Sequence, residues 1–155
     1  MVSAAACPVK AVLALVLLAG CFWRSYGPQV VTHTEVLEGI ARKGADLVGS
    51  GRLTAESMPE LTYPLERAVA FAEKARAHGG AAPPSLVAFE ALIARYREFV
   101  DALDRARREH EPSAARTTLA PPLAAVEAAG QRVREALDAE GRPMRAASAS
   151  PASRP

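Results

Sequence analysis

The thiol of Cys21 is the side chain in this sequence with the clearest chemical potential. It follows two small residues, Ala19 and Gly20, and the apolar run 11–18, which begins directly after the single basic residue Lys10. A short apolar helix delivers a segment to a membrane, small residues let a peptidase approach the backbone, and a thiol is a nucleophile. This order predicts a short membrane-directed segment that ends in a nucleophilic cysteine.

The four residues that end this segment resemble the lipobox of bacterial lipoprotein signal peptides: Leu18, Ala19, Gly20 and Cys21. The resemblance covers residues 1–21. It implies that the cysteine thiol carries a diacylglycerol and that cleavage makes this residue the amino terminus. Because Phe22 and not an aspartate comes next, similarity to lipoproteins of bacteria with two membranes implies the outer membrane, on its periplasmic side.

Two other interpretations of the leader remain open. A transmembrane anchor needs about 20 apolar residues, whereas the uncharged run 11–23 has 13. An ordinary secretory signal that happens to end at a cysteine is the second alternative. The leader also departs from the usual pattern, because residues 1–8 contain no lysine or arginine.

Aromatic residues gather just after the cysteine, where Phe22, Trp23 and Tyr26 are three of the eight aromatic residues in the chain. Amphipathic rings favour the headgroup depth of a membrane, and Arg24 has the charge to meet lipid phosphate. We expect these residues to lie on the membrane within a tether, residues 21–31. A featureless tether is the alternative.

Charge and cysteine content exclude several functions. Removal of residues 1–20 removes one lysine and no acid, so the 19 basic residues become 18 against 17 acidic ones. A nearly neutral domain has no electrostatic footprint for nucleic acid. Cys7 leaves with the leader and Cys21 is consumed by lipid, so no disulfide is expected and the fold must depend on burial.

The first helix of the remaining chain is predicted over residues 32–48. Thr32 and Glu35 have the spacing of a capping box, and Val31 and Val36 have the positions of a hydrophobic staple. Apolar residues then keep helical spacing until two glycines end the pattern.

The second helix is predicted over residues 62–78. A start before Thr62 would bring the ring of Pro64 against the carbonyl of Glu60. The two glycines after His78 terminate this helix.

Prolines and a glycine bound the third and fourth helices. The third is expected to open at residues 83–85 and to stop before Pro112. The fourth is expected to hold Pro121 and Pro122 in its first turn, where a missing N–H costs little, and to end at Gly141.

These elements predict an all-α fold, an antiparallel up-down bundle of four helices joined by short loops. A three-helix bundle with a loosely attached first helix is the alternative. The chain therefore divides into a signal peptide over 1–20, the tether over 21–31, the bundle over 32–140 and a disordered tail over 141–155.

The predicted core joins Phe89 and Ile93 of the third helix to Val126 and Val133 of the fourth. Other core positions carry small side chains, which let helices approach closely but bury little area each. They are Ala68, Ala72, Ala75, Ala129 and Gly130. Modest stability is expected.

Beyond Cys21, no motif predicts a reaction. His33 and His78 are expected at one pole and His110 about 35 Å away along the third helix, so the three histidines do not form a metal site. The last two are expected to cap helix ends. Signatures of haem attachment, paired metals, phosphate loops and serine nucleophiles are absent from the sequence. We expect no cofactor and no enzymatic activity.

The end of the third helix is a candidate partner surface, because this helix has about 25 residues against about 16 in the first two. Its basic end is expected to project beyond its neighbours, with Arg105, Arg107 and Arg108 available to a partner. The alternative is a solvated extension, since acids four residues away, such as Asp104, explain these charges as exposed helix pairs.

Two function classes remain. The first is a non-enzymatic accessory or structural lipoprotein that presents a protein-binding surface to another envelope protein close to the membrane. The second is a small-ligand carrier with a cavity between its helices.

Overall fold

The computed structural model describes the backbone of residues 9–78, 81–108 and 112–141 and the side chains of 26–78, 81–108 and 114–141. The elements of the described residues are four α-helices and one 3₁₀ turn, with no strand: α1 Val9–Gly49, η1 Ala55–Ser57, α2 Met58–Ala77, α3 Pro84–Arg108 and α4 Pro112–Ala139. The predicted four-helix bundle is confirmed.

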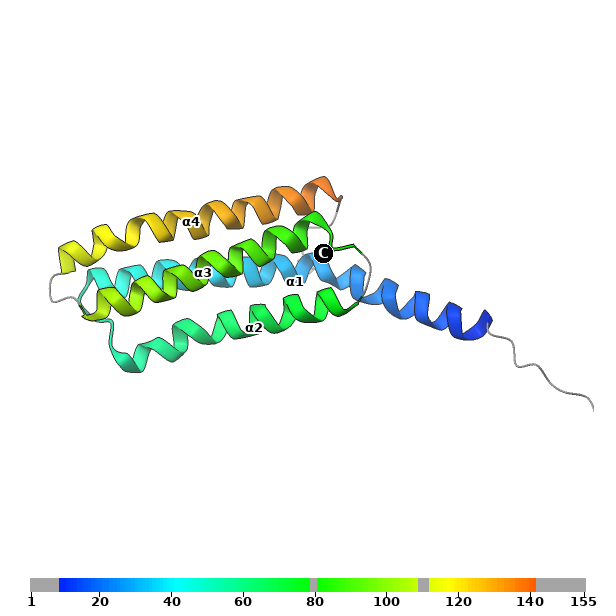
Figure 1. Ribbon diagram of the computed structural model, residues 1–155, viewed down its shortest axis with the longest axis horizontal. Helices are drawn as coiled ribbons and strands as arrows, with labels where there is room; N and C mark the ends of the chain where they lie inside the picture. Colours follow the sequence, from blue (N-terminus) through cyan, green and yellow to red (C-terminus); the bar gives the residue numbers. More distant parts are fainter. Residues whose placement is uncertain (1–8, 79–80, 109–111, 142–155) are drawn as a thin grey trace, which may run out of the picture.

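The helices run alternately up and down along a common axis (Figure 1). α1 and α3 each contact all three other helices, whereas no contact joins α2 to α4 within the described residues. The first half of α1 extends beyond the bundle, past the end where α2 stops and α3 begins (Figure 1). We call this end the entry pole.

α1 is longer than the sequence predicts, and the expected start at Thr32 is wrong. The helix continues through residues 21–31, including Pro28. The Thr32 hydroxyl donates to the Pro28 carbonyl at 2.9 Å, one turn back, and does not cap a helix start. Tyr26 and Val30 flank the proline and are fully buried, so packing of this face offsets the hydrogen bond that the proline removes.

α2 also begins a turn earlier than expected, at Met58. Pro64 therefore lies inside the helix and leaves the Glu60 carbonyl without its usual N–H partner. Leu61 is fully buried, and its carbonyl accepts a 2.7 Å hydrogen bond from the Tyr96 hydroxyl of α3. Tertiary contacts thus stabilise the turn that the proline weakens.

The bounds predicted for α3 are confirmed, whereas the start predicted for α4 is wrong. Pro121 and Pro122 lie in the interior of α4, which begins at Pro112. Ala115 and Leu119, just before the prolines, are buried and belong to the core. The predicted stop of α4 at Gly141 is confirmed, and this residue has a φ of 64° that favours glycine. The predicted disordered tail lies, from residue 142 on, outside the described residues.

The predicted core is confirmed. Phe89, Ile93, Val126 and Val133 are all buried, as are the five alanine and glycine positions expected to be small. Aromatic side chains contribute much of the remaining volume, and they lie fully or nearly fully buried: Tyr26, Phe71, Phe89, Tyr96 and Phe99. Burial raises the pKa of Tyr96 above its ordinary range.

Candidate functional site

The lipobox residues lie within α1, on the part that extends from the bundle: Leu18, Ala19, Gly20 and Cys21. Tyr26, which is fully buried in the core, follows Cys21 by only five positions. At about 1.5 Å per helical residue, this separation is about 7.5 Å along the axis. The cysteine therefore lies close to the entry pole and is joined to it by continuous helix.

The aromatic cluster after the cysteine is divided by the structure. Phe22, Trp23 and Arg24 belong to α1, and their side chains lie outside the described residues. Tyr26 is not the membrane-facing ring that we expected. Its ring stacks on Phe71 with centroids 5.9 Å apart, because the helix directs it into the core.

None of the helices in the described part of the chain combines the length and the apolarity that crossing a membrane requires.

The entry pole is closed by a polar network that links three helices. The Glu140 carboxylate, just after α4, accepts hydrogen bonds from the backbone N–H of Ser85 at 2.7 Å and from its hydroxyl at 2.9 Å. Ser85 Oγ also lies 3.3 Å from the Tyr26 hydroxyl oxygen. A carboxylate at a helix start satisfies free N–H groups and complements the helix dipole, so Glu140 fixes the first turn of α3.

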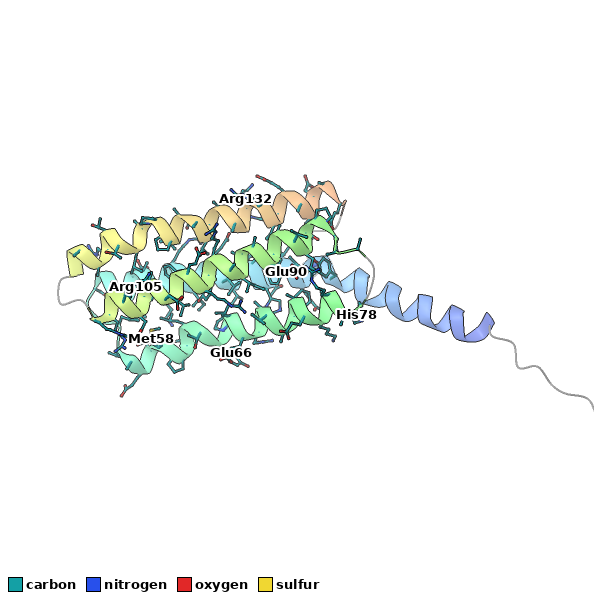
Figure 2. The ribbon with its side chains drawn as sticks, in the orientation of Figure 1. Met58, Glu66, His78, Glu90, Arg105 and Arg132 are labelled. Atoms are coloured by element: carbon teal, nitrogen blue, oxygen red, sulfur yellow. The ribbon has the colours of Figure 1, made fainter. Side chains whose placement is uncertain are left out.

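The predicted partner surface at the end of α3 does not project from the bundle. Leu103 and Ala106 are buried there, because the longer α4 covers this end of α3. Arg107 and Arg108 both pair with Asp104, and the two guanidinium groups lower the pKa of that carboxyl. Arg105 lies at the pole opposite His78 (Figure 2).

The histidines have separate environments. His78 Nδ1 lies 2.9 Å from the Lys74 carbonyl, as expected for a residue that caps the end of α2. His110 lies outside the described residues. His33 packs against Phe71 and Phe89, with ring centroids 5.0 and 6.1 Å away. Burial, and to a lesser degree the charge of Arg67, lower the pKa of His33.

Glu38 and Arg134 form a nearly buried ion pair that the sequence analysis missed. Arg134 donates two hydrogen bonds to the carboxylate, at 2.8 and 3.1 Å, and the Glu38 side chain is 7 % exposed. Gly130 provides the space, because a Cβ at this position would lie 1.9 Å from Glu38 Oε1. The sequence signal was a glycine one turn before an arginine on the buried face of a helix.

A Gly130→Ala substitution tests this close approach. We expect a loss of about 1–3 kcal/mol in the free energy of unfolding, because the added methyl displaces the carboxylate from Arg134. Gly39→Ala is the matched control, since nothing lies within 4 Å of its Cβ position. Gly39→Ala should raise the free energy of unfolding by up to about 1 kcal/mol, because alanine favours the helix at this exposed position. Chemical denaturation measures the free energy of unfolding of both variants. If both are stabilised, Glu38 does not approach Gly130 as closely as the structure shows.

Surface grooves lie between neighbouring helices in the described residues. The groove between α3 and α4 holds about 260 Å³, that between α2 and α3 about 200 Å³ and that between α1 and α2 about 120 Å³. Small-molecule sites usually measure about 300–1,000 Å³. These grooves suit protruding side chains of a partner better than a whole ligand.

Within the described residues, no three histidine, cysteine, aspartate or glutamate side chains gather in a way that could hold a metal ion. No protein-family model, curated protein or solved structure matches this chain.

Proposed function

We propose that this protein is a lipid-anchored protein of the bacterial envelope, with a non-enzymatic accessory or structural role. Its helical bundle presents a protein-binding surface to another envelope protein. The lipid is carried by Cys21. The next residue, Phe22, favours the outer membrane, on its periplasmic side.

The observation that carries the proposal is the continuity of α1 from Cys21 into the core at Tyr26. A flexible tether over 21–31 would let the bundle move up to about 35 Å from the membrane. The helix instead limits the separation between the cysteine and the first core residue to about 7.5 Å. A lipid on this cysteine would hold the entry pole against the bilayer, with the bundle standing end-on.

Lipidation is tested by metabolic labelling with a fatty-acid probe. We expect the wild-type protein to be labelled and Cys21→Ser to lose at least about nine-tenths of the signal, because serine lacks the nucleophilic thiol. Cys7→Ser is the matched control and should be labelled like the wild type. Equal labelling of Cys21→Ser would refute the anchor. If the protein migrates with inner-membrane markers in a density gradient, the outer-membrane assignment is refuted.

A further inference from the structure

The groove between α1 and α2 contains two of the three large apolar side chains that are most exposed in the described residues. Val36 is 42 % exposed and Tyr63 is 59 % exposed, and Val87 on α3 is the other large apolar residue exposed to this extent. The first two line the same groove, together with four further residues: Thr32, His33, Pro64 and Arg67. Its volume of about 120 Å³ is close to the cavity of ~150 Å³ that accommodates a benzene ring, so the groove has room for one side chain.

The charge that lines this groove is positive and uncompensated. Arg67 is exposed and forms no ion pair with any side chain that the structure describes. No carboxylate lines the groove. Its ionisable side chains besides Arg67 are His33 and Tyr63. The neighbouring groove between α2 and α3 differs, because there Arg76 pairs with Glu90.

Two aromatic rings of the core lie behind the His33 ring, which lines the groove. His33 is half-buried, and its ring packs against Phe71 and Phe89. The groove therefore has an aromatic floor, an apolar rim and one free guanidinium. An apolar side chain would displace water from the rim, and an adjacent carboxylate would find a bidentate partner in Arg67.

We propose that this groove docks a protein segment in which one apolar side chain lies beside a carboxylate. The inference rests on the protein-binding part of the proposed function and names its surface. Val36 follows Cys21 by 15 residues of continuous helix, so an anchored bundle would hold the groove about 22 Å from the lipidated residue. The partner segment would then lie close to the membrane.

Charge favours a partner over the two occupants that this chain could supply. Residues 142–155 contain three arginines and no acid, so they repel the guanidinium of Arg67. In a second copy, two of the three exposed large apolar residues lie in this same groove, so their approach would bring two Arg67 guanidinium groups together. The third, Val87, lies one turn from Glu90, whose carboxylate is already paired with Arg76. A separate acidic segment offers complementary charge without breaking an existing ion pair.

The test is a nuclear magnetic resonance titration of the full chain in a mild detergent. The probe is a blocked pentapeptide with a central leucine between two aspartates. Two comparison peptides replace the leucine by alanine or the aspartates by lysines. We expect the leucine–aspartate peptide to shift resonances of residues 32–36 and 63–67 with millimolar affinity, and each comparison peptide to bind at least about fivefold more weakly.

Arg67→Gln should weaken binding of the leucine–aspartate peptide by about five- to tenfold, because it keeps the aliphatic stem and removes the charge. Arg132→Gln is the matched control. It removes a guanidinium from the groove between α3 and α4 and should leave binding unchanged.

Equal binding of the lysine peptide, shifts confined to other residues, or no shifts at all would each overturn the proposal. Shifts of residues 32–36 that depend on protein concentration alone would identify a second copy as the occupant and also overturn it. The titration is repeated with Cys21→Ser. Peptide binding there should equal the wild type, so a failure of docking is distinguished from a failure of lipid anchoring.

Discussion

Arg134→Met is expected to lower the free energy of unfolding by about 3–5 kcal/mol, because it leaves the Glu38 carboxylate buried without a partner. Arg134 provides both of the side-chain hydrogen bonds that this carboxylate accepts within the described residues. Circular-dichroism melts and urea denaturation of the purified protein measure the loss.

The matched control is Arg95→Met, which removes the partner of Glu98 in an exposed pair on α3. No measurable change is expected there, because water screens both charges. The double variant Glu38→Leu/Arg134→Met should recover most of the stability, since apolar side chains of similar size replace buried ion pairs well. A double variant as unstable as Arg134→Met would show that shape, and not charge, explains the loss.

Phe89→Ala is expected to cost about 3–5 kcal/mol, through lost burial and a residual cavity. The ring is fully buried and lies against Phe71 in an edge-to-face arrangement with centroids 5.9 Å apart. For a domain of ordinary stability, about 5–15 kcal/mol, this loss is a large fraction of the total. The melting temperature of the variant measures it.

Val87→Ala is the control on the same helix, two residues away. Its side chain is 54 % exposed, so the substitution should change stability by less than about 0.5 kcal/mol. A Phe89→Ala protein that melts with the control would mean that α3 does not pack as the structure shows.

The sequence alone was sufficient for the fold class and for the buried faces of the helices. Apolar residues at helical spacing identified Phe89 and Ile93 on α3 and Val126 and Val133 on α4, because this spacing depends only on the pitch of the helix. The bounds of α3 followed equally well, since its first proline occupies a first turn and a second proline follows its end.

The prolines within helices misled the sequence analysis, because their effect depends on what surrounds them. Pro28, Pro64 and the pair that begins at Pro121 each weaken a helix locally by about 3 kcal/mol. Residues beside the prolines offset that loss in all three helices, because they are buried against other segments of the chain. No local pattern contains this information.

The candidate sites also differ in whether a local sequence pattern or only the tertiary structure reveals them. A local motif marks Cys21, whose predicted chemistry needs only its immediate neighbours in the sequence. The Glu38–Arg134 pair joins residues 96 positions apart, and the groove on α1 and α2 combines Val36 with Tyr63 and Arg67. The sequence by itself determined the helical class, the core faces and the candidate anchor, whereas only tertiary packing decided where helices begin, which charges are neutralised and which apolar side chains stay exposed.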